Sequence, residues 1–303
     1  MSRTNFRHSA FVYESDDEYV VRSVEFLRAG AEAGEGGLVA ARHDRLELIR
    51  EGFDRPPEGI AFLDTASSAA RPARTLAARY TTLLDRLQRF PAMRLLTDVQ
   101  YGPTADDWRE WIGYEAALNR TLARLPVWAI CAYDARRAPA PLLEALWETH
   151  PEVIAGGEPA SNGYRDPREV VRGLAGEPSQ LPDLRTVAAG AGPDDLRERL
   201  APALAAEGVE GQKALGMLIA ANEVAANARC HGEPPVELRV GRHAGRFVCE
   251  IEDRGTGFDD PLAGFDPPLE RGRRAPGLWV VRQLVWKLEA FPTAAGFTVR
   301  LWL

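Results

Sequence analysis

The sequence has almost no lysine. Only Lys213 and Lys287 occur among 303 residues, against 35 arginines, and residues 1–181 contain no lysine at all. Nucleotide-binding loops of the G-x-x-x-x-G-K-[ST] type grip phosphate with their lysine. The first 181 residues therefore cannot contain such a loop, and any nucleotide bound there would need other groups to contact its phosphates.

Long hydrophobic runs and basic clusters are also missing. No run of 18 apolar residues occurs, and the N-terminus MSRTNFRHSAFVYES has no apolar segment of a signal peptide. The net charge of −7 is modest and the acidic residues are scattered, which argues against nucleic-acid binding. The three cysteines are odd in number and fit a reducing compartment better than a disulfide framework. We therefore expect a cytoplasmic protein without direct contact to nucleic acid or membrane.

The first half of the chain alternates short apolar runs with amphipathic stretches. The runs are SAFVYE, GGLVAAR, GIAFLDT, MRLLTDVQ and VWAICAYD. Their spacing predicts βαβ units, that is, a mainly parallel α/β sheet with helices on both faces. A stretch rich in Gly, Pro, Ser and Asn at 156–182 predicts the connection between two domains. We expect a first domain at 1–165, a linker at 166–181 and a second domain at 182–303.

The order of elements changes in the second half. From residue 184 the pattern predicts a strand, a helix, a long helix, two strands, a Gly- and Arg-rich loop, a helix and a last strand or strand pair. This is an α+β layer with mixed or antiparallel strands. The long helix covers roughly 211–230 and carries Glu223 and Asn227 one turn apart, on a helix otherwise suited to burial. Their polar side chains in that place indicate a function.

Two further motifs follow the long helix. The second strand after it ends in Asp253-Arg254-Gly255-Thr256-Gly257. The carboxylate can accept a hydrogen bond from an exocyclic amine, and the glycines let backbone pass close to a flat ring. An ordinary Asp-Gly turn is the favoured explanation when the motif is taken alone. The loop at 270–277 then precedes a helix, as in a phosphate cradle, with an ordinary surface loop as the alternative.

Together these motifs resemble the GHKL ATPase fold. Their order is Glu-x-x-x-Asn with His-Gly behind it, Asp-x-Gly-x-Gly about 25 residues later, a Gly-containing loop that opens a Leu-Trp helix, and GFTVRLWL at the C-terminus. Residues 182–303 look most like the small anti-sigma-factor serine/threonine kinases. The resemblance implies an α+β (Bergerat) sandwich that binds ATP and Mg²⁺.

The resemblance also implies roles for individual residues. Glu223 would act as general base on the incoming hydroxyl, and Asn227 would coordinate the Mg²⁺ that bridges the ATP phosphates. Asp253 would read the adenine amine. The remaining expected positions are Gly255 and Gly257 beside the ring, Gly277 and Leu278 at the phosphates, and Thr298 in support of the aspartate.

The Gly-rich loop departs from the family pattern. Ala275-Pro276-Gly277 stands where a G-x-G pair is usual. Proline lacks an N–H donor and alanine resists positive φ, so catalysis would be slow or absent even where nucleotide binds. Arg271, Arg273 and Arg274 are further candidates for phosphate contacts, with a solvated basic loop as the alternative.

The five histidines argue against an autophosphorylating histidine kinase, because none begins a phosphoacceptor helix pair. For His231 we expect a role in ending the long helix, with Gly232 as the C′ residue. Transfer to a partner's serine, or partner binding alone, is more consistent. The partners implied are a sigma factor or an STAS-type anti-sigma antagonist, and such kinases often form homodimers. The alternatives are a non-enzymatic anti-sigma or adaptor module and a stand-alone ATPase.

Residues 5–168 resemble the MEDS sensory domain, which is named for methanogen and methylotroph regulators. The resemblance implies a RecA-like sheet without a working P-loop that receives a signal. The signal would reach the second domain through the connection or a shared interface. The matching motifs are HSAFVYESDDEYVVRSVEFLRAGAEAGEGGLVA, Tyr114-Glu115 with Asn119, CAYD (131–134), THPEV (149–153) and Asn162-Gly-Tyr164.

Six residues of this half are candidates for a small-molecule or redox-sensing pocket. Packing is the alternative, because a cysteine in an apolar strand is usually inert and isolated His or Tyr residues are usually core or rim groups. The histidines and the cysteine lack metal-ligand spacing, so we expect no metal there. The six candidates are His8, Tyr13, Tyr114, Glu115, Cys131 and His150.

Overall fold

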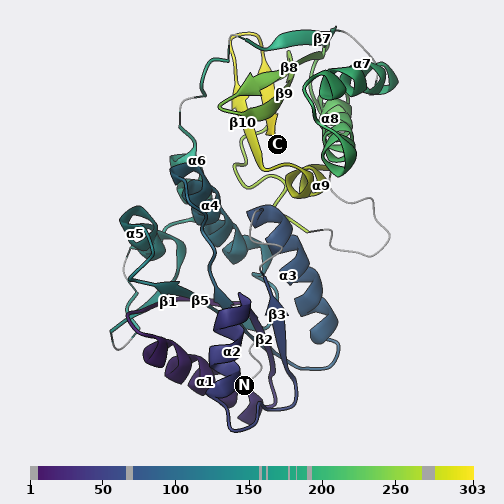
Figure 1. Ribbon diagram of the computed structural model, residues 1–303. Coiled ribbons are helices and arrows are strands. Elements are labelled where there is room, and N and C mark those ends of the chain that lie inside the picture. The colour runs from purple at the N-terminus through teal and green to yellow at the C-terminus, as the bar shows by residue number, and fades with distance from the viewer. Residues whose placement is uncertain are drawn as a thin grey trace. The chain divides into compact units, whose positions relative to one another are not determined.

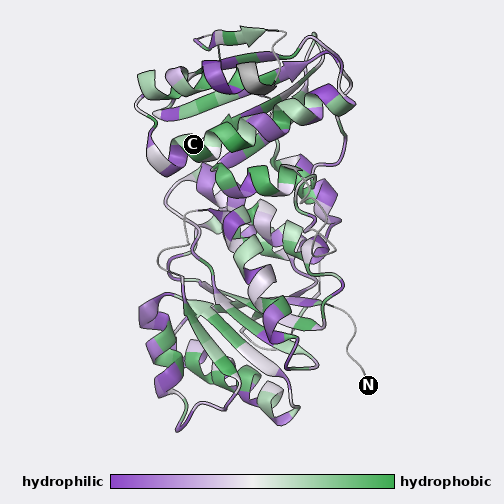
Figure 2. Ribbon diagram, turned by 90° about the vertical axis from the view of Figure 1, so that its right-hand side faces the viewer, coloured by the Kyte–Doolittle hydropathy of each residue, from purple (hydrophilic) through white to green (hydrophobic). Residues whose placement is uncertain are grey.

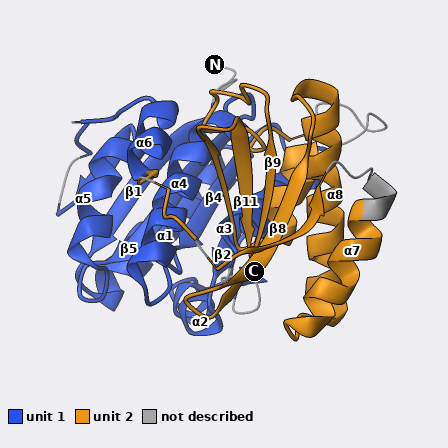
Figure 3. Ribbon diagram, turned by 90° about the horizontal axis from the view of Figure 1, so that it is seen from above, with its two compact units in different colours: residues 1–174 blue, residues 175–303 orange. Residues whose placement is uncertain are grey.

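Two units with separate cores make up the chain, residues 1–174 and 175–303 (Figure 3). The structure is a computed structural model. It describes residues 6–65, 71–156, 159–161, 163–176, 178–181, 183–189, 193–267 and 277–303.

Unit 1 is built on a six-stranded sheet in the order β3-β2-β4-β5-β1-β6, in which all neighbours run parallel. Strands β2 and β4 are buried along their whole length, as expected for a sheet covered on both faces. Figure 2 shows green, hydrophobic segments in the strands of the parallel sheet. The strands are β1 (Arg7–Tyr13), β2 (Gly36–Ala41), β3 (Ile60–Asp64), β4 (Met93–Asp98), β5 (Val127–Asp134) and β6 (Glu152–Ala155).

Helices cover both faces of this sheet (Figure 1). α1 (Asp16–Glu32) and α2 (His43–Glu51) lie on one face, over a core that includes Phe11, Tyr13 and Val39. The other face carries α3 (Pro72–Arg86), α4 (Ala105–Thr121) and α5 (Ala140–Thr149). The sequence therefore predicted the layered α/β architecture correctly.

The residues that we assigned to a linker include a helix, α6 (Pro167–Leu174), which belongs to unit 1. Val170 is 4% exposed, and Leu174 lies one turn later on the same side. A Cβ built on Gly113 of α4 would be 3.7 Å from Leu174 Cδ1, which places α6 against α4. The apolar spacing of these residues, rather than the surrounding Gly and Pro, decides the local structure.

Unit 2 is a two-layer sandwich. Its five-stranded sheet has the order β10-β11-β9-β8-β7 and is antiparallel throughout. Its elements are β7 (Arg185–Ala189), α7 (Pro193–Ala206), α8 (Gly211–His231), β8 (Glu237–His243), β9 (Arg246–Asp253), α9 (Gly277–Leu284), β10 (Lys287–Pro292) and β11 (Phe297–Trp302).

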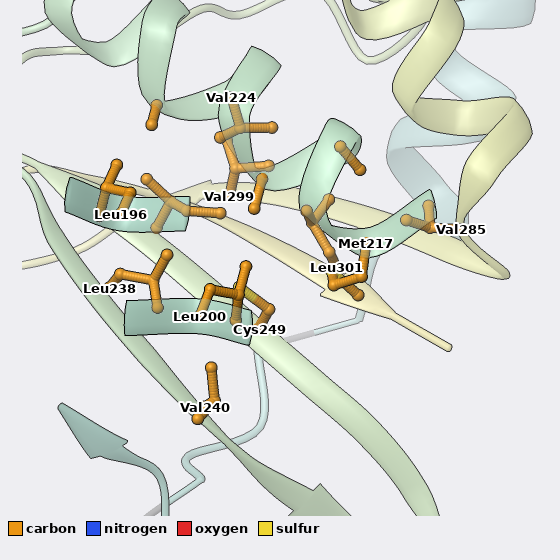
Figure 4. Close-up of a cluster of buried hydrophobic side chains, with 14 of the residues drawn as sticks. Leu196, Leu200, Met217, Val224, Leu238, Val240, Cys249, Val285, Val299 and Leu301 are labelled. Carbon is orange, nitrogen blue, oxygen red and sulfur yellow. The ribbon is translucent and has the colours of Figure 1, made fainter. Parts of the chain in front are cut away.

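The core of unit 2 lies between the helices and one face of the sheet (Figure 4). Met217 and Val224 of α8 meet Leu238 of β8 and Leu301 of β11 there. The predicted long helix is confirmed as α8, and the predicted α+β sandwich is confirmed with it. Among the described helices, none has the length and apolar character that crossing a membrane would require.

Candidate functional site

The phosphate end of the expected ATP site is formed by α8 and the start of α9. Glu223 and Asn227 lie one turn apart on α8, and both are half-buried. Gly277 begins α9 directly against them: a Cβ built on it would lie 2.8 Å from Glu223 Oε2 and 3.4 Å from Asn227 Nδ2. A larger residue would press on these side chains, so the glycine permits the approach. The fold thus brings three predicted residues from two motifs together.

The groups at the start of α9 fit an anion with a divalent cation. The first turn of α9 has backbone N–H groups without intrahelical partners, and the helix dipole there favours negative charge. Carboxylate and amide oxygens are ligands that Mg²⁺ accepts, usually together with water and phosphate oxygens. Glu223 and Asn227 supply one of each beside that turn.

Asp253 ends β9 and is 8% exposed. Its Oδ1 accepts hydrogen bonds from the backbone N–H groups of Gly255 at 2.7 Å and Glu233 at 3.3 Å. The second contact joins the strand end to the segment that leaves α8. The predicted adenine reader is therefore held in a fixed orientation by two donors, one of them from its own Asp-x-Gly motif.

Gly232 lies against Asp253, and its backbone conformation differs from our expectation. His231 ends α8 as predicted, but Gly232 has an extended backbone with φ −94° and ψ −163°, not the left-handed conformation of a C′ glycine. A Cβ built on Gly232 would lie 2.4 Å from Asp253 Oδ1. The position needs glycine because Asp253 approaches it closely.

An aromatic ring that we did not assign to the site lies beside Asp253. Phe297 pairs with Asp253 across β9 and β11, so both side chains leave the same face of the sheet. Gly257 has φ +66°, and a Cβ on it would lie 2.1 Å from Phe297 Cδ2, so the ring covers this glycine. The ring centroids of Phe258 and Phe297 are 5.1 Å apart. The Gly-Phe pair before Thr298 in the sequence was the signal for this neighbour.

Thr298 does not contact Asp253. It pairs with Glu252 across the two strands, and its hydroxyl donates to Glu252 Oε2 at 3.0 Å. Because side chains alternate along a strand, Glu252 and Asp253 point to opposite faces. Thr298 thus joins the charged face of the sheet, where Arg300 Nε lies 2.6 Å from Glu250 Oε1.

Leu278 is the predicted phosphate-site residue that follows Gly277 on α9. Leu278 is half-buried and packs against the core of unit 2, and a Cβ on Gly264 would lie 2.7 Å from its carbonyl oxygen. Leu278 therefore anchors α9. The loop candidates Arg271, Arg273 and Arg274, with Ala275 and Pro276, lie outside the described residues.

Four of the six sensory candidates of unit 1 come together between the sheet and helices α4 and α5. We call this group the buried cluster: His8 on β1, Glu115 on α4, Cys131 on β5 and His150 after α5. One ligand-type atom from each lies within 4.8 Å of all the others. We had expected no metal because these residues lack metal-ligand spacing in the sequence. In the folded chain, however, they lie close together.

Glu115 Oε2 is the centre of the buried cluster. It lies 3.2 Å from His8 Nε2, 3.3 Å from Cys131 Sγ and 3.5 Å from His150 Nε2. His8 Nε2 is also 3.4 Å from Cys131 Sγ. None of the four residues is more than 1% exposed.

A second layer of hydrogen bonds orients these groups. His8 Nδ1 is 3.1 Å from Asn119 Oδ1, and the Asn119 amide donates to the Thr149 carbonyl at 2.8 Å. His150 Nδ1 is 3.2 Å from the Leu146 carbonyl. The Tyr133 hydroxyl donates to Glu115 Oε1 at 2.9 Å. We had not assigned Tyr133, although its position two residues after Cys131 puts it on the same face.

Comparison with known families accounts for both units. Residues 7–151 match MEDS, the methanogen/methylotroph, DcmR sensory domain. Residues 192–303 match the histidine kinase-like ATPase domain. The chain is a MEDS domain followed by a histidine kinase-like ATPase domain. A comparison with curated proteins finds no match. The MEDS domain thus carries the buried cluster, and the ATPase domain carries Glu223, Asn227 and Gly277.

The MEDS domain holds an acidic helix start where P-loop proteins bind phosphate. After β1 the chain turns directly into α1, whose N-cap is Ser15 and whose first turn contains Asp16, Asp17 and Glu18. Three carboxylates at a helix N-terminus satisfy its dipole and repel phosphate. This arrangement agrees with the missing lysine.

Burial and hydrogen bonding change the pKa values within the buried cluster. Burial alone would raise the pKa of the Glu115 carboxyl, but the neighbouring His150 and His8 rings hold it below its usual range. Burial lowers the pKa of His150 to about 4. Burial, and then the charge of Glu115, raise the pKa of Cys131 well above its usual value.

The two tyrosine candidates lie outside the buried cluster. Tyr13 faces the α1 side of the sheet, where its hydroxyl donates to Asp98 Oδ1 at 3.5 Å. It is five residues from His8, and odd spacings in a strand lead to opposite faces. Tyr114 precedes Glu115 on α4 and accepts a hydrogen bond from Arg79.

A hollow of about 290 Å³ in the MEDS domain was not predicted from the sequence. It opens on the α1 side, away from the buried cluster, and Phe11, Phe26 and Trp128 form its apolar wall. Arg7 and Arg94 stack on Trp128, at 3.7 and 4.8 Å from the ring centroid. A small apolar molecule has room there.

Proposed function

We propose that this signalling regulator uses its MEDS domain to control an ATP-dependent serine/threonine kinase of the anti-sigma type. Its substrate would be a serine of an STAS-type antagonist protein, and its second partner a sigma factor. The observation that carries the proposal is the meeting of Glu223, Asn227 and Gly277 at the start of α9. A carboxylate and an amide lie beside a helix start, and this supports a site for a phosphate and its cation.

Each of these residues would have one task. Bound Mg²⁺-ATP supplies the phosphoryl group that is transferred. Asn227 would hold the cation, and Glu223 would take the proton from the attacking serine hydroxyl. Asp253, fixed through its Oδ1 by Gly255 and Glu233, would accept a hydrogen bond from the adenine amine.

The test is a phosphotransfer assay with the full chain, labelled ATP, Mg²⁺ and a candidate antagonist protein. We expect label on a partner serine. For Glu223→Gln we expect the phosphotransfer rate to fall by about 100-fold or more, with ATP affinity preserved. Glu210→Gln is the control, because it makes the same chemical change at the exposed N-cap of α8, where the side chain forms no capping hydrogen bond. Equal rates for Glu223→Gln and the wild type would refute the kinase.

A second function is favoured by the position of Phe297. Its ring covers Gly257 beside Asp253, in the part of the site that we assign to adenine. If the ring keeps this position, the domain would act as an anti-sigma adaptor that binds its partner without phosphorylating it. Phe297→Ala separates the two: stronger ATP binding in the variant supports the adaptor, and weaker binding supports a ring that lines the kinase pocket.

Control by the MEDS domain is a separate part of the proposal. Within unit 2, Arg300 Nη2 donates to the Ser179 carbonyl at 2.9 Å, so the connection is attached to β11, which also pairs with the Asp253 strand. A change in the MEDS domain could act through this contact. Cys131→Ser should alter the phosphotransfer rate while leaving ATP affinity unchanged. An unchanged rate would mean that the buried cluster does not influence the kinase.

A further inference from the structure

The buried cluster combines side chains that rarely share a closed space without a ligand. Two imidazoles, one thiol and one carboxylate converge from four elements, and each residue is at most 1% exposed. All four are ligand types for divalent transition metals. His150 Nε2 is buried and makes no hydrogen bond, although it points at Glu115 Oε2 from 3.5 Å. A buried polar atom in this condition indicates a missing partner.

The separations fit one ion at the centre. Zinc binds imidazole nitrogen and carboxylate oxygen at about 2.0–2.2 Å and thiolate sulfur at about 2.3 Å, so the edges of its tetrahedron are roughly 3.3–3.6 Å long. Four of the edges of the buried cluster are 3.2, 3.3, 3.4 and 3.5 Å. The remaining ligand-atom pairs stay within 4.8 Å, so small rotations of the imidazoles would complete the tetrahedron.

The hydrogen bonds around the cluster leave the correct atoms for a metal. His8 and His150 each direct Nδ1 to an oxygen, of Asn119 and of Leu146, and this leaves the Nε2 lone pair of each ring inside the cluster. Tyr133 takes up Glu115 Oε1 and leaves Oε2 inside. Metal sites use such outer partners to fix ring tautomers and carboxylate orientation.

The charges also balance. A divalent ion with one thiolate, one carboxylate and two neutral imidazoles has no net charge, which suits a region closed to water. Cys131 would lose its thiol proton to solvent as the ion enters, so no oxidant or further reactant is needed.

We propose that the buried cluster is a closed, four-coordinate site for one divalent transition-metal ion, with Zn²⁺ as the ion that its donors fit best. The ion joins β1 and β5 to α4 and the end of α5, and so links two neighbouring strands of the MEDS sheet to its outer helix layer. The inference concerns the MEDS domain alone and stands whether or not the ATPase domain phosphorylates a partner.

Uptake of Co²⁺ and Zn²⁺ by the full chain tests the site. Cys230 is exposed, so the experiment uses a Cys230→Ser background to remove a surface thiol. The protein is unfolded, refolded with a slight excess of Co²⁺ or Zn²⁺ and freed of unbound ion, and metal content and absorption are measured. We expect about one ion per chain and, with Co²⁺, a thiolate charge-transfer band with strong tetrahedral d–d bands.

Two substitutions and one control make the result specific. Cys131→Ser should abolish the charge-transfer band, and Cys249→Ala, which removes the other buried thiol, should retain it. Tyr133→Phe keeps all four donors and should bind Co²⁺ roughly 10-fold more weakly with the band intact. The proposal is overturned if the background protein takes up no ion, or if band and affinity are the same in all three variants. In that case the buried cluster is a proton-linked His–Glu network only.

Discussion

The two candidate sites differ in how they are closed. In the MEDS domain, four residues at most 1% exposed come from four elements and face one another with no opening. In the ATPase domain, Glu223 and Asn227 are half-buried on one helix, and the glycine that begins the next helix lies against them. A closed site retains what it holds, whereas an open one allows a substrate to enter and a product to leave. The first group of residues is thus sealed from solvent, and the second is partly open to it.

The largest expected effect is the loss of stability when the buried cluster of the MEDS domain is disrupted. Glu115→Ala removes the carboxylate that three other groups face, and breaking such a buried charged group costs about 3–5 kcal/mol. Hydrogen exchange of the β1 and β5 amides in the full chain would measure this loss for the MEDS domain alone. Glu148→Ala is the control, because that side chain is 46% exposed and pairs with Arg165 at 3.3 Å, so its loss should cost at most about 1 kcal/mol. Similar losses in both variants would contradict a special role for Glu115.

A second buried carboxylate of the MEDS domain, Asp98, should make the stability of this domain depend on pH. Asp98 is also buried, but burial raises its pKa to about 6, and the charge of Arg45 only partly opposes this. The folded state therefore holds a proton that the unfolded chain releases near pH 4, so this group weakens folding as pH rises from about 4 to about 6.

Asp98→Asn should remove that pH dependence. The variant should match the wild type below pH 4 and exceed its stability by up to about 3 kcal/mol above pH 6, since one pKa unit corresponds to about 1.4 kcal/mol. Denaturant unfolding at pH 4 and pH 7.5 measures the difference. A gain of the same size at both pH values would show that Asp98 is not held protonated by burial.

In the open site, Asp253→Asn tests base recognition with the backbone contacts preserved. Asparagine can still accept from Gly255 and Glu233 but presents an amine in place of the second oxygen. ATP binding should weaken by about 10- to 100-fold, the value of a hydrogen bond to a charged group. Inosine triphosphate, which carries a carbonyl in place of the adenine amine, should lose much less. A loss of the same size for both nucleotides would contradict adenine recognition by Asp253.

The smallest effect on stability comes from Gly277→Ala. The new methyl would lie 2.8 Å from Glu223 Oε2 and displace that flexible side chain, so phosphotransfer should fall about 10-fold or more while stability changes by at most about 1 kcal/mol. Gly173→Ala in α6 is the matched control. A Cβ there meets nothing within 4 Å, so that variant should gain about 0.5–1 kcal/mol and keep its activity. Equal activity in the two variants would contradict the contact with Glu223.

The sequence predicted the open site better than the closed one, for a physical reason. Glu223 and Asn227 are related by one helical turn, and Asp253 and Gly255 by one strand end, so local geometry alone decides their relation. Thr298 was named in place of Phe297 because the register of β11 against β9 decides which of them shares a face with Asp253. Register is a long-range property that the local pattern does not contain.

The buried cluster depends wholly on long-range order. His8 and Cys131 meet because β1 lies next to β5, a pairing across more than 100 residues that the alternation of elements does not specify. Candidate residues could therefore be named from the sequence, but not their joint arrangement. Tyr13 shows the reverse: its separation from His8 was predictable from strand alternation alone.

The last comparison is between two asparagines of α8, of which only one is assigned to the cation. Asn222 is half-buried like Asn227, and its Oδ1 accepts no hydrogen bond from the described residues. Five residues separate the two, so at 3.6 residues per turn their side chains leave the helix about 140° apart. Asn222→Ala therefore removes the same amide from the same helix without removing the assigned ligand.

The central claim for the open site is that Asn227 holds the cation of bound ATP. Calorimetric titration of ATP into the full chain, with and without Mg²⁺, tests it most directly when the wild type is compared with Asn227→Ala and with Asn222→Ala. The account predicts that Mg²⁺ strengthens binding by about 10-fold or more in the wild type and in Asn222→Ala, and that Asn227→Ala loses this gain. Undiminished Mg²⁺-dependent binding in Asn227→Ala would contradict it.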